Sequence, residues 1–80
     1  MKKYVVATMN FFDNKIIQKV VEAESDIEAA KKFRASQYNN DEDNANELEF
    51  QQSPDYPKTV EELDQYLFNG DELISVIEIE

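Results

Sequence analysis

The chain has no cysteine and no histidine among its 80 residues. Without cysteine it can form neither a disulfide bond nor a thiolate nucleophile, which suits a reducing cytosol, and we therefore expect a cytoplasmic protein. The commonest general base and the strongest nucleophile of enzyme active sites are also missing, so we expect a protein that is not an enzyme. Zinc is disfavoured because cysteine and histidine are its usual ligands.

Glycine and long apolar runs are scarce as well. Gly70 is the only glycine, so the chain has no glycine-rich loop of the kind that cradles phosphate groups. Its apolar runs are too short for a membrane-spanning helix or for the hydrophobic region of a signal peptide. We therefore expect no bound cofactor and no contact with a membrane.

Basic residues are almost absent from one half of the chain. Residues 1–40 carry five acidic and seven basic residues, whereas residues 41–80 carry thirteen acidic residues and Lys58 as their single base. The net charge of −10 therefore comes from the second half. Such an excess works against compaction, so it usually serves solubility or a basic partner. It argues against direct binding to nucleic acid, and we expect a basic protein surface as partner.

The first half predicts two strands and a helix. Residues 4–9 and 16–21 are rich in β-branched and aromatic side chains, and the turn residues between them predict a hairpin that is tightest at Asp13-Asn14. Neither strand alternates cleanly, which indicates that at least one is covered on both faces. Ser25 and Glu28 form a capping box, which predicts a helix over residues 26–37.

The segment from 39 to 57 is rich in asparagine and acidic residues. A structureless stretch of this length is uncommon in a compact domain, so we expect either a long acidic loop or a short helix near residues 44–50. Leu48 and Phe50 are its strong apolar anchors.

A second capping box follows this segment at Thr59 and Glu62. It predicts a second helix whose apolar stripe includes Leu63 and Leu67 and whose end at Asn69-Gly70 places Gly70 at positive φ. Residues 73–79 then read as the last strand.

The order β-β-α-α-β predicts a single α+β domain over residues 1–80. We expect a three-stranded antiparallel or mixed sheet with two helices packed on one face and the last strand beside the first. Phe33, Leu67 and Phe68 are expected in the core. Of the neighbours Phe11 and Phe12, one is expected in the core and the other exposed.

The acidic segment partly resembles a calcium loop. Such a loop needs an oxygen ligand at its fifth position, glycine at its sixth and glutamate at its twelfth. Counted from Asp41, these positions hold Ala45, Asn46 and Gln52. The pattern fails three times, so we predict a solvated acidic loop, with a weak divalent site as the remaining alternative.

The acidic residues of the second half predict one broad negative surface. Carboxylates on a helix and a neighbouring loop can approximate the charge row of B-DNA, which carries one charge about every 1.7 Å. The predicted acidic face comprises Asp41, Glu42, Asp43, Glu47, Glu49, Asp55, Glu61, Glu62, Asp64, Asp71 and Glu72. Tyrosine is favoured at interfaces, which predicts an aromatic rim at Tyr38, Tyr56 and Tyr66.

Two functions follow from these features. The first is a non-catalytic binding protein that mimics nucleic-acid charge and occupies a basic surface of a DNA- or RNA-binding host protein. The alternative is a small structural module that forms a homodimer or docks through its sheet edge, with acidity serving only solubility.

The start of the chain resembles the strand–strand–helix opening of small phage- and plasmid-borne proteins, including DpnD/PcfM-like domains. The likeness lies in Val21-Glu22-Ala23-Glu24-Ser25 and Glu28-Ala29, covers residues 1–34 and fits a final strand at 73–79. It implies a mobile-element setting, a host cytoplasm and an inhibitor of host proteins, but no particular site residue. The long acidic insertion and the second helix depart from the pattern.

Overall fold

The computed structural model describes residues 1–36 and 41–79. These residues form an α+β fold with one antiparallel sheet, whose strand order is β2-β1-β3. The last strand therefore lies beside the first, as predicted. The elements are β1 (Lys2–Asn10), β2 (Lys15–Ala23), α1 (Asp26–Ser36), α2 (Asp41–Gln51), α3 (Val60–Phe68) and β3 (Glu72–Glu78).

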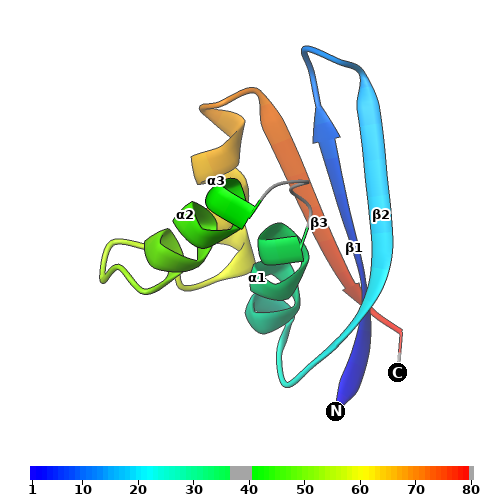
Figure 1. Ribbon diagram of the computed structural model, residues 1–80. Coiled ribbons are helices and arrows are strands. Elements are labelled where there is room, and N and C mark those ends of the chain that lie inside the picture. The colour runs from blue at the N-terminus through cyan, green and yellow to red at the C-terminus, as the bar shows by residue number, and fades with distance from the viewer. Residues whose placement is uncertain (37–40, 80) are drawn as a thin grey trace.

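All three of these helices lie on one side of the sheet (Figure 1). Helices α1 and α3 contact the strands, whereas α2 packs on α1 and lies farther out. The prediction of two helices was therefore one too few for the described chain. Of the two alternatives for residues 39–57, the helix is correct, and it extends over Asp41–Gln51.

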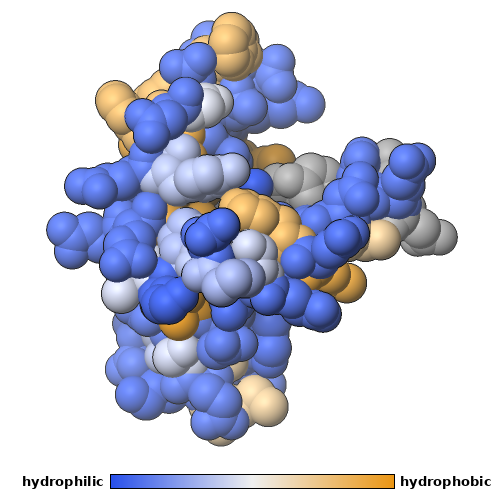
Figure 2. Space-filling view, turned by 90° about the vertical axis from the view of Figure 1, so that its left-hand side faces the viewer, coloured by the Kyte–Doolittle hydropathy of each residue, from blue (hydrophilic) through white to orange (hydrophobic). Residues whose placement is uncertain are grey.

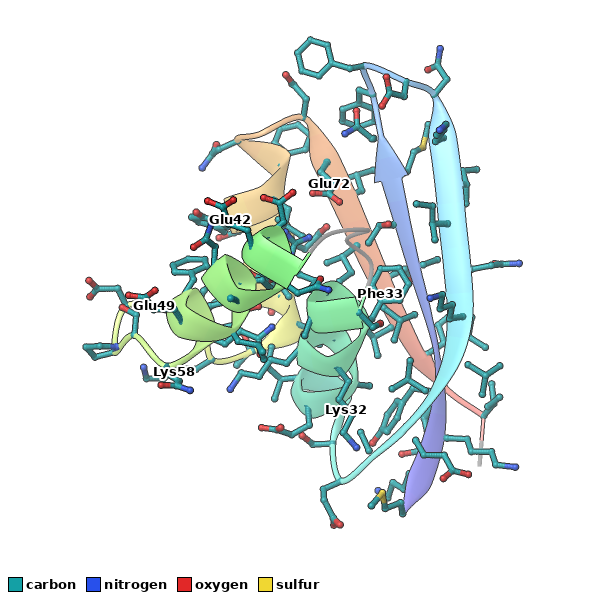
Figure 3. The ribbon with its side chains drawn as sticks, in the orientation of Figure 1. Lys32, Phe33, Glu42, Glu49, Lys58 and Glu72 are labelled. Atoms are coloured by element: carbon teal, nitrogen blue, oxygen red, sulfur yellow. The ribbon has the colours of Figure 1, made fainter. Side chains whose placement is uncertain are left out.

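The core lies between the sheet and the two inner helices. Val6 of β1, Phe33 of α1 and Leu63 of α3 are its largest fully buried side chains. Figure 3 shows Phe33 between α1 and the strands. Leu67 is buried as predicted, and Ile74 brings β3 into the same cluster.

The strands are covered on one face only. Along β1, Tyr4, Val6 and Thr8 are buried and alternate with half-buried neighbours. Residues 15–20 of β2 are all exposed. The prediction that one strand is covered on both faces was wrong, because every described helix packs on the same side of the sheet.

The turns reverse the chain at asparagine and aspartate. Asn14 has a φ of 51°, which agrees with the predicted tight point of the hairpin. The expected positive φ at Gly70 was wrong, and Asp71 has a φ of 63° instead. Gly70 N–H donates to the Leu67 carbonyl, and Asp71 N–H donates to the Phe68 carbonyl. The turn that follows α3 therefore includes Gly70, and the residue with positive φ is Asp71, one position later than predicted.

Several apolar side chains lie outside the predicted core. Phe68 is 59% exposed, and its ring meets the edge of Phe11, which is itself 39% exposed. Phe12 is exposed, so neither phenylalanine of the hairpin belongs to the core. Leu48 is exposed as well, whereas Phe50 packs against the core as an anchor of α2.

Candidate protein-binding surfaces

Most of the predicted acidic face lies on the helical side of the molecule. Its exposed members belong to α2, α3 and the connections that follow each helix. We call this set the helical acidic surface, and it comprises Glu42, Asp43, Glu49, Asp55, Glu61, Glu62 and Asp71. Figure 3 shows Glu42 and Glu49 on α2, away from the sheet. Viewed from this side, the surface is mostly hydrophilic (Figure 2).

Two predicted members of the acidic face point inward instead. The Nε of Arg34 donates to Oε1 of Glu47 over 2.8 Å, and Nη1 of Arg34 lies 3.4 Å from Oε1 of Glu72. Glu47 is 7% exposed, and Glu72 is half-buried. The prediction that both are surface carboxylates was wrong, because Arg34 compensates the cost of burying them. Asp41 begins α2.

Two further acidic residues serve the fold. Oε2 of Glu62 accepts from Lys58 N–H over 3.0 Å, while Glu62 N–H donates to Oγ1 of Thr59 over 3.1 Å, which confirms the predicted cap. Oδ1 of Asp64 accepts from Ile74 N–H over 3.0 Å. Asp64 therefore joins α3 to the outer edge of β3, and it is half-buried rather than fully exposed.

The predicted aromatic rim is only partly at the surface. Tyr66 is 51% exposed, and its ring lies 5.6 Å from that of Phe50. Tyr56 is 4% exposed and packs against Phe50 on its inner side, so its placement on a rim was wrong. The remaining rim prediction, Tyr38, falls outside the described residues.

The opposite side of the sheet is apolar and bears no described helix. Because residues directly opposite each other in an antiparallel pair point to the same face, the register defines rows across the strands. We call this surface the open sheet face. Its rows are Glu22–Lys3, then Val20–Val5–Ile77, then Gln18–Ala7–Ser75, then Ile16–Met9–Leu73.

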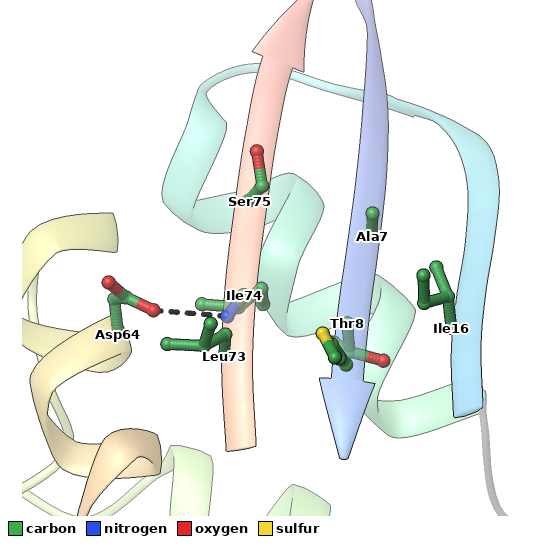
Figure 4. Close-up of a pocket in the computed structure, with 8 residues that line it drawn as sticks. Ala7, Thr8, Ile16, Asp64, Leu73, Ile74 and Ser75 are labelled. Carbon is green, nitrogen blue, oxygen red and sulfur yellow. Dashed lines mark hydrogen bonds between the residues drawn. The ribbon is translucent and has the colours of Figure 1, made fainter. Parts of the chain in front are cut away.

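The rows of the open sheet face differ in the size of their side chains. Two of these rows consist of large aliphatic side chains, and the row between them has the small residues Ala7 and Ser75 beside the longer Gln18. A hollow of about 270 Å³ lies beside Ala7 and Ser75, and its lining also includes Thr8, Met9, Ile16, Leu73, Ile74 and the carboxylate residue Asp64. Figure 4 shows Ala7 and Ser75 on the neighbouring strands β1 and β3.

Sequence reasoning missed the open sheet face. The sequence feature that indicates this face is the occurrence of two adjacent apolar residues at two places in β2, Ile16-Ile17 and Val20-Val21. This pattern was interpreted as a strand that is covered on both faces. In each pair, one residue points toward the helices and the other toward solvent. Ile16 and Val20 are 68% and 60% exposed.

Two features of the described residues bear on catalysis, the grouping of acidic side chains and the shifted pKa values. Within residues 1–36 and 41–79, no group of three or more acidic side chains is arranged to hold a metal ion. The shifted pKa values belong to the sheet: burial raises the pKa of the Tyr4 hydroxyl, and a hydrogen bond to Glu78 raises the pKa of Lys2. Lys2 also forms an ion pair with Glu78, which links β1 to β3 over 3.3 Å.

No described helix combines the length and apolar character needed to cross a bilayer. Comparison of the chain with models of protein families, with curated proteins and with solved structures finds no match.

Proposed function

We propose that the chain is a non-catalytic binding protein whose helical acidic surface contacts a basic surface of a nucleic-acid-binding protein. The observation that supports this function is the separation of charge in the fold. Helices α2 and α3 contain acidic residues and no basic residue; α2 lies on the outside of the helical layer, and α3 packs on β3 with its other side exposed. A basic partner would be attracted to that layer at long range.

The fold does not need all of these carboxylates. Glu47 and Glu72 are paired with Arg34, and Glu62 and Asp64 cap backbone N–H groups. In contrast, the side chains of Glu42, Glu49 and Glu61 are exposed and make no hydrogen bond or ion pair within the described part of the chain. Such unpaired carboxylates repel one another and lower the stability of the fold, and binding to a basic partner would offset this repulsion.

The spacing on α2 supports a resemblance to nucleic acid. Glu42 and Glu49 are seven residues apart, so they lie on one side of α2, about 10.5 Å apart along its axis. This distance is about the rise of three base pairs of B-DNA. A groove that binds phosphates would therefore meet carboxylates at a compatible interval.

The test compares two variants with the same change in net charge. The first replaces three members of the helical acidic surface: Glu42→Gln, Glu49→Gln and Glu61→Gln. The control replaces three exposed acidic residues of the hairpin and its exit: Asp13→Asn, Glu22→Gln and Glu24→Gln. Each tagged protein is used to capture partners from a cell lysate at low salt, with and without excess duplex DNA.

We expect wild type and the control to capture the same basic protein, which DNA and about 0.5 M salt displace. The helical variant should lose it. An equal loss in both variants would mean that binding depends on the net charge of the chain and not on the position of the carboxylates. A partner that persists in high salt and in excess DNA would contradict the proposal.

The exposed edge of β2 favours a second candidate function. β2 is an outer strand of the sheet, and an unpaired strand edge is a template for another strand. A module that docks through this edge would use its acidity only for solubility. Partner binding that survives the helical variant unchanged would favour this alternative.

A further inference from the structure

We propose that the outer edge of β2 binds an extended acidic segment of a partner protein, which adds a fourth strand to the sheet. The segment has acidic side chains opposite Lys15 and Lys19 and an apolar side chain between them. This contact gives a chemistry to the strand that the second candidate function would dock. It does not use the helical acidic surface, so it stands independently of the proposed basic partner.

The register shows which backbone groups of β2 point outward. Ile79 N–H donates to the Lys3 carbonyl over 2.8 Å, so the odd-numbered residues of β1 bond to β3. Because bonding alternates along an antiparallel strand, the even-numbered residues of β1 bond to β2, and their partners in β2 are odd-numbered. The N–H and C=O groups of Ile16, Gln18 and Val20 therefore point away from the sheet.

Lys32 closes one end of this edge. Its Nζ donates to the Glu22 carbonyl over 2.8 Å, which agrees with the outward direction of the even-numbered groups. Within residues 1–36 and 41–79, the outward backbone groups of Ile16, Gln18 and Val20 have no hydrogen-bond partner. This stretch of β2 is therefore open to a further strand.

The outer edge of β3 is less accessible to such a strand. Oδ1 of Asp64 already accepts from Ile74 N–H, and α3 packs on β3. The acidic side chains at the two ends of β3 are also engaged, Glu72 with Arg34 and Glu78 with Lys2. The two edges of the sheet thus differ, and β2 is the edge that offers both free backbone groups and free charge.

Charge defines the occupant of the β2 edge. Lys15 and Lys19 are exposed and lie on the helical side of the sheet, opposite Asn10 and Val6 of β1. Neither lysine forms an ion pair in the described part of the chain, although the protein has 18 acidic residues. Lys32 adds a third positive charge along the same side of the edge. An acidic strand would pair with these charges, and cross-strand pairs of opposite charge stabilise strand pairing.

The same lysines disfavour a second copy of β2 at this edge. Two β2 edges that paired with each other would bring the lysines of both copies together on one side, and lysine on an edge strand is a common protection against self-pairing. The acidic residues nearest to the open stretch in the sequence, Asp13 and Glu22, flank it and do not lie within it. Local charge at this edge therefore favours an acidic partner.

The acidic half of the chain does not prevent this contact. Neither α2 nor α3 contacts β2, and both lie away from it in the helical layer (Figure 1). At an ionic strength of about 0.15 M the Debye length is about 8 Å, so repulsion from those helices is screened at the β2 edge.

The register also specifies a probe for this edge. An antiparallel strand opposite residues 20 to 15 of β2 reads Val-Glu-Thr-Val-Val-Glu, with its glutamates opposite Lys19 and Lys15 and its threonine opposite Gln18. The N–H group of the threonine points toward β2, whereas that of the next residue points away. A peptide of this sequence with acetylated and amidated ends carries only the charges of its two glutamates.

The test is a titration of the whole isotope-labelled chain with this peptide, followed by NMR. We expect the amides of Ile16, Gln18 and Val20 to shift and to gain protection from hydrogen exchange, with a dissociation constant of about 1 mM or below. N-methylation of the threonine should abolish binding because it removes an inward N–H. N-methylation of the next residue is the matched control and should leave binding intact.

Lysine variants test the charge. Lys15→Gln combined with Lys19→Gln should weaken binding of the peptide at least about threefold. The control combines Lys31→Gln with Lys58→Gln, which changes the net charge equally at positions outside β2 and should keep the affinity. A peptide with lysines in place of both glutamates should bind the wild-type chain more weakly, and this comparison does not depend on the folding of a variant.

Four results would overturn the proposal. They are unchanged amides of residues 16–20 at about 1 mM peptide, equal binding of the two N-methylated peptides, equal binding of the glutamate and lysine peptides, and self-association that protects this edge in the absence of peptide. The variant with Glu42→Gln, Glu49→Gln and Glu61→Gln should bind the peptide as wild type does. Loss of the basic partner in that variant would therefore leave the β2 contact standing, and the two proposals fail separately.

Discussion

At the scale of single residues, Arg34 has the most consequential environment. Its guanidinium joins α1 to α2 through Glu47 and to β3 through Glu72. The side chains of Arg34 and Glu47 are 11% and 6% exposed. Removing one partner of a buried pair is costly because it leaves the other charge without compensation.

We predict that Arg34→Met lowers the free energy of unfolding by about 3–5 kcal/mol. Lys32→Met is the control on the same helix, because Lys32 is exposed and its removal should cost far less. Urea denaturation measures both changes. Adding Glu47→Leu to Arg34→Met should recover part of the loss, and equal costs for the two single variants would contradict this role of Arg34.

Tyr4 makes the fold sensitive to alkali. Burial raises the pKa of its hydroxyl, so the folded state favours the neutral form. A group whose pKa is raised by folding contributes its full stability below the unfolded value of about 10 and loses it as the pH rises further. Tyr4→Phe should therefore lose less stability between pH 8 and about 10.5 than Tyr66→Phe, whose tyrosine is exposed. Urea denaturation at the two pH values measures this, and equal losses would contradict it.

At the scale of elements, α3 is held at its start and at its middle. Oγ1 of Thr59 caps its start, and Oδ1 of Asp64 connects it to β3. We predict that Thr59→Ala lowers the free energy of unfolding by about 1 kcal/mol, because it removes a capping acceptor. Thr59→Ser retains the hydroxyl and should cost much less in the same urea denaturation. Equal costs would mean that packing rather than capping is lost.

The bond from Ile74 N–H to Asp64 protects the outer edge of β3. Asp64→Ala should leave this donor exposed and speed the hydrogen exchange of the Ile74 amide, whereas Asp64→Asn keeps an acceptor and should preserve most of the protection. Exchange followed by NMR measures both variants. An unchanged rate in Asp64→Ala would show that another group protects the edge.

Local signals predicted the elements that have local causes. The cap at Thr59 and the helix that begins at Asp26 were predicted from a few neighbouring residues. Helix α2 was left as one of two alternatives because it has no apolar stripe. Its inward side includes Glu47, whose partner Arg34 is thirteen residues earlier, so nothing near Glu47 in the sequence indicates its burial.

The helical acidic surface and the open sheet face could also be predicted only in part from local sequence. Composition located the acidic excess correctly in the second half of the chain, but it did not separate Glu47 and Glu72 from the exposed carboxylates. The open sheet face depends on which side of the sheet the helices cover, and that is decided by the packing of the whole fold. Doubled apolar pairs fit either one-sided or two-sided coverage.

At the scale of the whole molecule, opposite sides have opposite character. Helices with acidic outer surfaces form one side, and a sheet face with two rows of aliphatic side chains forms the other.

The excess charge also predicts how salt affects stability. Because a net charge of −10 repels itself, screening should stabilise the fold. If raising the salt concentration to about 0.5 M increases the free energy of unfolding by about 1 kcal/mol, the melting temperature should rise by about 4–8 °C. The variant with Glu42→Gln, Glu49→Gln and Glu61→Gln should gain less in a thermal melt. A melting temperature that does not change with salt would show that self-repulsion costs little.

The most direct test of the central claim is the affinity of the captured partner as a function of salt. Wild type, the helical variant and the hairpin control with Asp13→Asn, Glu22→Gln and Glu24→Gln are titrated by calorimetry at several salt concentrations. A helical acidic surface that binds the partner predicts weaker affinity and a flatter salt dependence for the helical variant alone. The same affinity and the same salt dependence in all three proteins would contradict it.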